Sequence, residues 1–331
     1  MKVAVLGAGA WGTAIAILMC ARHSVVLYAR SEAASADLSR SRVNQRYLPM
    51  ARLPDSLIVT NDFRQAVSHG AQGLTLIATP TDGLRATTRR VRQIAPQAPF
   101  VWLCKGFEQQ SGQLPHQIIE DECEYLGNSG PLSGPSFAIE VARGLPTALT
   151  VAGSPEFCEH VTAAVHTGPL RIYSTDDVVG VEVGGAVKNI MAVATGISDA
   201  LELGLNARAA LITRGLAEMT RIGIALGARA ETFMGLTGIG DLVLTATSDL
   251  SRNRRVGLAL GRGHSAASAV KELGHVAEGV RSTHAVLARA RQLGISMPIT
   301  EAVCAVLDGA LTPSEALHAL LAREPKPEML S

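Results

Sequence analysis

One lysine lies in the middle of a long apolar stretch, where a charged side chain is unfavourable unless it serves a structural or chemical function. Residues 178–203 contain no proline and carry apolar side chains on most helical faces, so they predict a buried helix surrounded by protein. Lys188 follows Gly184 by four residues and Gly185 by three, which places all three on one helical face. Each glycine costs a helix interior about 1 kcal/mol relative to alanine, so we expect something to approach closely there.

Lys188 has two interpretations. A lysine that lines a ligand cavity can give or take a proton when burial and a second cation, such as Lys105, lower its pKa from the ordinary value of about 10.4. The alternative is a structural lysine whose stem packs on apolar neighbours while its ammonium group reaches solvent. The glycine pair favours a lysine that lines a ligand cavity.

A glycine-rich turn near the N-terminus has the spacing of a dinucleotide-binding fingerprint. Gly7, Gly9 and Gly12 follow the β-rich run of residues 2–6 and precede an apolar helix expected at 13–21. The first glycine permits a tight turn, the second lets the backbone approach a pyrophosphate, and the third lets helix and strand pack. The pyrophosphate would bind at the helix N-terminus, where free N–H groups favour an anion. The alternative is a glycine-rich turn without a ligand.

The second expected strand, residues 25–29, ends at Arg30 and not at an acidic residue. Sites specific for NAD usually carry Asp or Glu here for the ribose hydroxyls, whereas a guanidinium group suits a 2′-phosphate. We therefore expect NADP or NAD as the cofactor, with NADPH favoured. The alternative is a solvated arginine at a strand end that Glu32 partly neutralises.

Polar residues follow two later strands, at the edge where a ligand crevice opens in a sheet of this kind. Lys105 comes directly after a strand expected at 100–104. In the loop at 133–138 a glycine and a proline fix the backbone and leave Ser136 available to a ligand. We expect both loops to contact the ligand, although Lys105 could also be a surface lysine at a turn.

Two loops in the second half carry a carboxylate and a group of cations. Asp241 ends a glycine-rich loop, where its alternative role is to cap a helix. Ser251 is expected to cap a helix whose first turn holds Arg252, Arg254 and Arg255, which is the unfavourable end for cations. A bound phosphate would remove the conflict, because helix N–H groups and a guanidinium group would share one anion. The alternative is a solvated basic surface, above all at Arg254 and Arg255.

Strand and helix patterns alternate up to residue 177, and no convincing strand pattern follows. The alternation predicts a parallel sheet covered by helices. The expected fold class is α/β, with an N-terminal Rossmann-type doubly wound sheet and an all-α C-terminal domain. We expect residues 1–177 to bind NAD(P) and residues 178–331 to form the helical substrate-binding and catalytic domain. The other expected strands are 57–60, 74–78, 147–151 and 170–173, and the other expected helices are 62–69, 155–166, 206–226, 279–293, 297–308 and 313–322.

Composition and charge narrow the function classes. The 331 residues are 47% hydrophobic and 18% charged, which is typical of a well-packed enzyme. A net charge of +1 gives no electrostatic case for binding nucleic acid or an anionic membrane. The five cysteines are scattered and the nine histidines form no close pair, so we expect reduced thiols, no metal and a cytoplasmic location. No uninterrupted apolar segment suggests an integral membrane protein.

Together these segments resemble the bacterial NAD(P)-dependent glycerol-3-phosphate dehydrogenase family over nearly the whole chain. The resemblance implies reversible reduction of dihydroxyacetone phosphate to sn-glycerol 3-phosphate, which supplies phospholipid synthesis. It also implies a site between the two domains, where Gly184 and Gly185 would make room for substrate, nicotinamide or both. The segments that carry the likeness are GAGAWGTA at 7–14, CKGFE at 104–108, SGPSFA at 133–138, VGGAVKNI at 183–190, NARAALITRGLAEM at 206–219, TGIGDLVLT at 237–245, SRNRR at 251–255 and EGVRST at 278–283.

The resemblance implies a role for individual residues. Lys188 would be the catalytic proton donor and acceptor, and Asp241 would either orient it or bind a substrate hydroxyl. The expected substrate contacts are Lys105, Gly134, Ser136, Lys188, Asp241, Ser251, Arg252 and Asn253. The expected cofactor contacts are Gly7, Gly9, Ala10, Trp11, Gly12, Arg30, Lys105, Ala138, Arg252, Val276 and Glu278.

Two other functions compete with this one. A related hydroxy-acid or ketopantoate-type dehydrogenase would also pair a Rossmann-type domain with a lysine-bearing helix, but it needs a carboxylate site, and the SRNRR segment favours a phosphate. A non-catalytic NADPH sensor would leave Lys188, Asp241 and Arg252 without a task. The expected partner is a small phosphorylated triose or glycerol. A homodimer is compatible with the sequence, which does not fix the oligomeric state.

Overall fold

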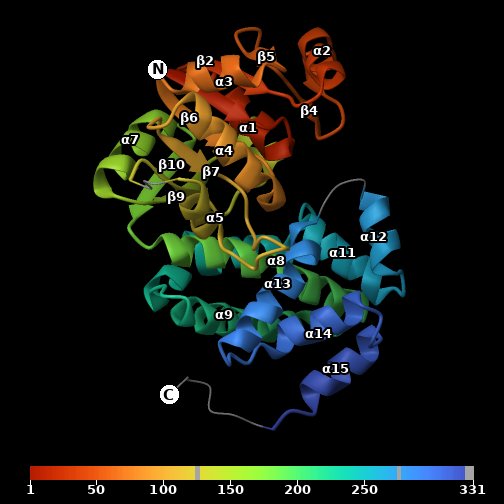
Figure 1. Cartoon of the computed structure of the whole chain (residues 1–331). Coiled ribbons are helices and arrows are strands. Elements are labelled where there is room, and N and C mark those ends of the chain that lie inside the picture. Colours follow the sequence, from red (N-terminus) through yellow and green to blue (C-terminus); the bar gives the residue numbers. More distant parts are fainter. Residues whose placement is uncertain (124–126, 274–276, 325–331) are drawn as a thin grey trace.

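Eight short strands form one sheet in the N-terminal half of the chain (Figure 1). The computed structural model describes residues 1–123, 127–273 and 277–324, and within them the strand order is β10-β9-β8-β7-β6-β1-β2-β5. The strands are β1 (Lys2–Leu6), β2 (Ser24–Tyr28), β5 (Ile58–Thr60), β6 (Gly73–Ile77), β7 (Phe100–Trp102), β8 (Ser129–Ser133), β9 (Thr147–Ala152) and β10 (Leu170–Thr175).

The order of the strands reverses at β1, which pairs in parallel with β2 on one side and with β6 on the other. Such a reversal opens a crevice at the carboxyl ends of the strands, where a doubly wound sheet binds its ligand. The predicted fold class is therefore confirmed. The glycine turn after β1 and Arg30 after β2 lie at this edge.

Helices and one small hairpin pack around the sheet. The helix after the glycine turn begins at Ala10 and not at Thr13, because Gly9 has extended backbone angles and serves as its N-cap. The helices are α1 (Ala10–Met19), α2 (Glu32–Ser41), α3 (Phe63–Gly70), α4 (Leu84–Ile94), α5 (Pro115–Glu122), α6 (Ala138–Ala142) and α7 (Pro155–Val165), and the hairpin joins β3 (Val43–Asn44) to β4 (Leu48–Arg52).

The predicted parallel sheet has one antiparallel pair near its edge. β8 pairs with β9 in antiparallel fashion, and β10 then runs parallel to β9. The connection from β8 to β9 contains only the five-residue helix α6, which rises about 7.5 Å at 1.5 Å per residue. A five-residue strand spans about 16 Å, so this helix does not carry the chain back along the sheet. The chain turns round instead.

The predicted central helix is confirmed as α8 (Val178–Ala200), three residues shorter than expected. Asp177 caps it, since its carboxylate accepts a hydrogen bond of 2.9 Å from the Gly180 amide. Every residue from Gly180 to Ser198 is buried. By length and composition α8 alone, among the described helices, could cross a membrane, but 89% of its apolar window is buried inside the protein. It is a core helix here.

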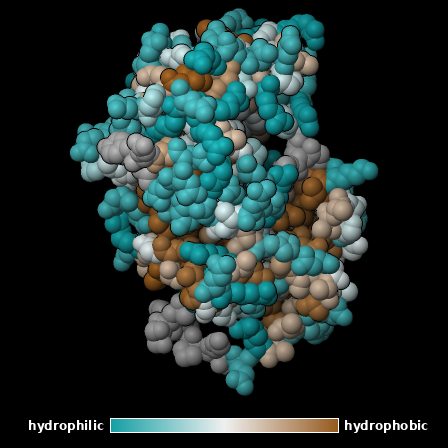
Figure 2. All heavy atoms as spheres, in the orientation of Figure 1, coloured by the Kyte–Doolittle hydropathy of each residue, from teal (hydrophilic) through white to brown (hydrophobic). Residues whose placement is uncertain are grey.

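Beyond α8 the described residues form helices joined by loops, and five of these helices pack against α8 (Figure 1). The described residues after 177 contain no strand, as predicted. In the view of Figure 2, hydrophilic residues cover most of the sheet-containing part, whereas hydrophobic residues reach the surface in patches of the helical part. The helices are α9 (Gly204–Ala225), α10 (Asp241–Thr247), α11 (Arg252–Gly261), α12 (Ala266–Leu273), α13 (Glu278–Gln292), α14 (Pro298–Leu307) and α15 (Pro313–Leu321).

Helices α8 and α11 touch backbone to backbone. A methyl group on Gly196 of α8 would lie 2.1 Å from the Arg254 carbonyl oxygen, and one on Gly257 of α11 would lie 2.1 Å from the Val193 carbonyl oxygen. The two glycines therefore set how closely α11, with its arginine-rich first turn, approaches the lysine-bearing helix.

We expect Gly196→Ala to lower the free energy of unfolding by about 2 kcal/mol or more, because the new methyl group has only backbone to displace. Urea denaturation measures the change. Gly168 is the matched control, since a methyl group there would meet no atom within 4 Å. Gly168→Ala should leave stability within about 0.5 kcal/mol of the starting value. Equal effects of the two substitutions would contradict the close crossing.

Candidate active site

A buried carboxylate joins the two lysines that the sequence singles out. The Lys188 ammonium on α8 donates to Asp241 Oδ1 at 2.5 Å, and the Lys105 ammonium, three residues beyond β7, donates to Asp241 Oδ2 at 2.7 Å. The Asp241 side chain is 1% exposed, that of Lys188 9% and that of Lys105 17%. One carboxylate thus draws together segments that lie 53 and 136 residues apart in the chain.

The glycines beside Lys188 make room for protein, and the expectation that they clear space for a ligand was wrong. A methyl group on Gly184 would lie 2.2 Å from the Thr237 carbonyl oxygen, in the loop that leads to Asp241. One on Gly185 would lie 3.3 Å from Lys105 Cγ. Gly184 therefore lets the Asp241 loop reach Lys188, and Gly185 lets the Lys105 side chain lie across α8.

Burial lowers the pKa of Lys188 to about 8. This value is the net result of burial and the nearby Lys105 ammonium, which both lower the pKa, and of the Asp241 carboxylate, which raises it. Burial would raise the pKa of Asp241, but the two lysines outweigh it and hold this pKa below its usual value. At neutral pH the cluster therefore holds two cations and one anion, and Lys188 is the member whose proton is most easily exchanged.

Lys105 also connects the cluster to the loop after β8. Its ammonium group donates to the Gly134 carbonyl oxygen at 3.0 Å, and Gly134 has a φ of 134°, which favours glycine. The Ser136 hydroxyl donates to the same carbonyl and accepts from the Trp11 indole at 2.9 Å. The predicted substrate loop and the dinucleotide fingerprint are thereby in direct contact.

The glycine turn fits a pyrophosphate. Gly7 has a φ of 129°, and a methyl group on Gly12 would lie 2.1 Å from the Gly7 carbonyl oxygen, so these two glycines are needed for the turn itself. A methyl group on Gly9 would meet nothing within 4 Å, and no side chain caps α1. The first amides of α1, at Ala10 and Trp11, have no acceptor within the helix and remain available to an anion.

Arg30 lies two residues beyond β2 and is exposed. Within the described part of the chain it has no ion-pair partner, so Glu32 does not neutralise it. The neighbouring Ser31 caps α2, since its hydroxyl accepts from the Ala34 amide at 3.0 Å. A free guanidinium group therefore stands at the position where the ribose of a dinucleotide is recognised.

The first turn of α11 combines a capping serine with arginines in different environments. Ser251 caps the helix as predicted, accepting from the Arg254 amide at 3.2 Å. Arg252 is exposed and has no ion-pair partner in the described ranges, so its guanidinium group can bind an anion together with the first helix amides. Asn253 instead points into the protein, where it donates to Asn189 Oδ1 at 2.9 Å and accepts from the Gly279 amide at 3.0 Å.

Arg254 belongs to the interior, and its alternative interpretation as solvated surface was wrong. Its guanidinium group donates to the Asp199 carboxylate on α8 at 2.9 and 2.7 Å, and Asp249 also pairs with it. Arg208 of α9 pairs with the same Asp199 at 2.7 Å. These ion pairs fix α11 on α8, whereas Arg255 is exposed.

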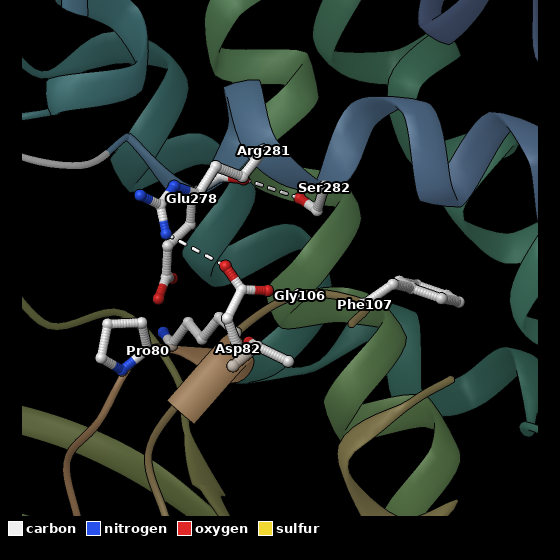
Figure 3. A pocket seen from close by; sticks show the side chains of 9 residues that line it. Pro80, Asp82, Gly106, Phe107, Glu278, Arg281 and Ser282 are labelled. Atoms are coloured by element: carbon white, nitrogen blue, oxygen red, sulfur yellow. Dashed lines mark hydrogen bonds and ion pairs between the residues drawn. The ribbon is translucent and has the colours of Figure 1, made fainter. Parts of the chain in front are cut away.

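A small pocket lies beside Lys105, with about 250 Å³ of empty space including its mouth. Figure 3 shows Glu278 and Arg281 entering it from α13, opposite Pro80 and Asp82. Arg281 pairs with Asp82 at 3.0 Å and so links the two parts of the protein across the pocket. Burial raises the pKa of Glu278, against the opposing effect of Arg252, Lys105 and Lys188.

Two other predicted cofactor contacts are Val276 and Ala138. Val276 is outside the described residues, and Ala138 is the first residue of α6, close to the Ser136 loop. Prediction from sequence missed Thr245, whose hydroxyl accepts from the Lys188 ammonium at 2.9 Å. Its position four residues after Asp241 places both on one face of α10, a signal that the sequence does carry.

Among the described residues, a single group of three potential metal ligands comes together: His284, Cys304 and Asp308, on and just after α13 and α14. None of the three takes part in the hydrogen bonds of the lysine–aspartate cluster.

The sheet with its glycine fingerprint and the buried lysine–carboxylate–lysine cluster define a two-part, dinucleotide-dependent dehydrogenase. Comparison with known proteins identifies which one. The models of the NAD-dependent glycerol-3-phosphate dehydrogenase N-terminus and C-terminus match residues 2–158 and 177–318. The chain belongs to this family.

Individual relatives agree with the family models. The chain is 57% identical over 332 residues to a glycerol-3-phosphate dehydrogenase [NAD(P)+] of Burkholderia orbicola, covering 99% of this chain and all of the relative. It is 52% identical over 330 residues to the protein of the same name from Dechloromonas aromatica, with the same coverage. A crystal structure of glycerol-3-phosphate dehydrogenase from Coxiella burnetii superposes with a TM-score of 0.91 at 39% identity, over 97% of this chain and 98% of that one.

We expect Asp241→Asn to lower the pKa of Lys188 below its present value of about 8, because burial and Lys105 remain while the stabilising carboxylate is lost. NMR titration of ¹³Cε-labelled lysines measures this pKa, and Lys188→Arg assigns the signal. Asp249→Asn, which removes an exposed aspartate paired with Arg254, should leave the pKa where it is. An unchanged pKa in Asp241→Asn would show that the carboxylate does not stabilise the ammonium form.

Proposed function

We propose that this chain catalyses the reversible NAD(P)-dependent reduction of dihydroxyacetone phosphate to sn-glycerol 3-phosphate. The observation that carries the proposal is the buried Lys188–Asp241–Lys105 cluster beside the anion-accepting first turn of α11. Relatives that share more than half of their residues with this chain bear the name of this activity. Residues 1–177 would hold the nucleotide, and residues 178–331 would hold the substrate and supply the proton.

Lys188 is the acid for reduction and the base for oxidation. The bound dinucleotide supplies the hydride at the substrate carbon. The Lys188 ammonium gives its proton to the carbonyl oxygen as the negative charge develops there, and in the reverse direction its amine removes the proton of the hydroxyl. A pKa of about 8 leaves both forms within reach of neutral pH.

Asp241 orients the proton donor. Both of its oxygens already accept hydrogen bonds from Lys188 and Lys105. This favours an orienting role for Asp241 over direct binding of a substrate hydroxyl. The Lys105 ammonium group stabilises negative charge at the reacting oxygen. Ser136 and the Gly134 loop lie next to Lys105 and would contact the triose.

The substrate phosphate binds at the N-terminus of α11. Ser251 holds the helix start, Arg252 supplies the charge, and Asn253 fixes this turn to α8 through Asn189. This arrangement separates the proposed activity from that of a ketopantoate-type dehydrogenase, whose substrate presents a carboxylate. A non-catalytic NADPH sensor would have no use for the lysine pair.

The nucleotide binds along the carboxyl edge of the sheet. Gly9 leaves the approach to the pyrophosphate open, and the free Arg30 favours NADPH over NADH. The remaining proposed contacts are Gly7, Ala10, Trp11, Gly12, Lys105, Ala138, Arg252, Val276 and Glu278. We further place the activity in the cytoplasm, in the supply of phospholipid precursors, and in a chain that could act as a homodimer.

The direct test is NADPH oxidation by the purified chain with dihydroxyacetone phosphate or ketopantoate as the acceptor. We expect turnover with the phosphorylated ketone alone. Lys188→Ala should lower kcat at least a thousandfold while the Kd for NADPH changes less than twofold, since the proton donor is lost and the fingerprint is untouched. Turnover with ketopantoate alone, or wild-type turnover by Lys188→Ala, would refute the proposal.

Arg252→Ala should raise the KM for dihydroxyacetone phosphate about tenfold to a hundredfold, because a charge-assisted hydrogen bond contributes about 1.5–3 kcal/mol. Steady-state kinetics at saturating NADPH measures it. Arg255→Ala removes an exposed arginine from the same helix and should leave KM within twofold. If both variants raise KM equally, general surface charge and not a phosphate site attracts the substrate.

Arg30→Asp should shift the ratio of kcat/KM for NADPH over NADH by at least tenfold towards NADH. The carboxylate can accept the ribose hydroxyls and repels a 2′-phosphate. Assays with both nucleotides at fixed dihydroxyacetone phosphate measure the ratio. An unchanged ratio would remove Arg30 from the nucleotide site.

A further inference from the structure

The geometry points to Glu182 as a positioning residue. It fixes the position of Lys105, in the sheet-containing part, relative to Lys188 on α8. The inference rests on the proposed function, since it concerns the alignment of that reaction's two lysines. Glu182 lies on α8, six residues before Lys188, and its side chain is 1% exposed.

The Glu182 carboxylate accepts hydrogen bonds from two elements of the sheet-containing part. Its Oε1 atom accepts from the Trp102 indole at 2.9 Å and from the His116 backbone amide at 2.8 Å. Its Oε2 atom lies 2.5 Å from His116 Nδ1, which donates because a carboxylate only accepts. Every bond of this carboxylate therefore crosses from α8 to the other part of the protein.

The two partners of Glu182, Trp102 and His116, lie in segments next to Lys105 in the fold or the chain. Trp102 is the last residue of β7, and Lys105 follows it by three residues. His116 lies in the first turn of α5, whose free amides favour a carboxylate. One buried group thus fixes the end of the strand that leads to Lys105 and the start of the next helix.

The contacts follow a single ridge of α8. Glu182, Gly185 and Lys188 are spaced by three residues, so they lie in a row along the helix. Glu182 binds Trp102, Gly185 packs against the Lys105 stem, and Lys188 meets Lys105 through Asp241. At Gly185 the neighbours are the Ser133 hydroxyl and the Lys105 stem, and glycine has no side chain to bond to either, so this contact permits sliding. The directional hydrogen bonds at Glu182 do not permit sliding. They therefore fix how this row of α8 residues is aligned with the sheet-containing part.

A carboxylate is a costly choice for packing alone. Burial raises the pKa of Glu182, whereas an apolar side chain of similar size would fill the same space without desolvation. What the carboxylate adds is direction, through three hydrogen bonds with fixed geometry. A misplacement of about 1 Å at reacting groups can cost a hundredfold in rate, which makes such a restraint useful for catalysis.

Glutamate 218 provides a matched control within the same chain. It is also buried, and it accepts from the Ile299 amide at 2.6 Å, the Thr300 amide at 3.2 Å and the Thr300 hydroxyl at 3.0 Å. These bonds cap α14 and do not reach the sheet-containing part. Loss of either carboxylate should lower stability, but only Glu182 should affect the alignment of the lysines.

The experiment compares Glu182→Ala, Glu182→Gln and Glu218→Ala by single-turnover hydride transfer from NADPH to dihydroxyacetone phosphate. We expect Glu182→Ala to slow transfer about tenfold to a hundredfold with NADPH affinity within twofold. Glu182→Gln should recover to within about threefold. Its amide oxygen accepts from Trp102 and from the His116 backbone amide, and its NH₂ group donates to His116 Nδ1 once the ring carries its proton on Nε2. Glu218→Ala should transfer hydride within twofold of wild type.

The inference is overturned if Glu182→Ala transfers hydride at the wild-type rate, if glutamine rescues nothing, or if Glu218→Ala slows transfer equally at an equal loss of stability. Should Glu182→Ala not fold, Trp102→Phe removes the indole donor together with part of a buried ring, and it must slow transfer at least threefold. If the wild type does not reduce dihydroxyacetone phosphate, the proposed function fails separately. NMR titration of Lys188 then tests the register alone, since Glu182→Ala must shift this titration and Glu218→Ala must not.

Discussion

The structure depends on one shared charge, the Asp241 carboxylate between the ammonium groups of Lys188 and Lys105. Two buried cations would repel each other without it, and one buried carboxylate would be unstable without them. In the proposed reaction, this arrangement keeps a net positive charge beside the substrate oxygen that becomes negative. Because burial brings the pKa of Lys188 to about 8, the same lysine can serve both directions of the reaction.

Several features of the fold are consequences of bringing these three groups together. Gly184 admits the backbone that carries Asp241, and Gly185 admits the stem of Lys105. Glycines at the α8–α11 crossing bring the proposed phosphate-binding turn close to the same helix, and the Arg254–Asp199 ion pair fixes it there. At these positions α8 thus carries glycines and ion-paired side chains, where a core helix usually carries large apolar side chains.

Local patterns predicted much of this from sequence. The fingerprint, the central helix, the Ser251 cap and the candidate lysines were recognisable because each depends on residues near one another in the chain. The salt bridge from Asp241 to both lysines was not, since its partners are 53 and 136 residues apart. The same limit hid the interior role of Arg254 and the antiparallel entry of β9. It also led to the wrong purpose for the glycines, because sequence shows that space is needed but not what fills it.

The most direct test of the central claim is the pH dependence of single-turnover hydride transfer in both directions with the wild-type chain. Reduction needs protonated Lys188, so its rate should fall as pH rises through about 8. Oxidation needs the amine, so its rate should rise over the same interval. Two opposite profiles with a common midpoint near 8 are the predicted result. A midpoint near the ordinary lysine value of about 10.4, or profiles of the same sign, would contradict a buried lysine as the shared acid and base.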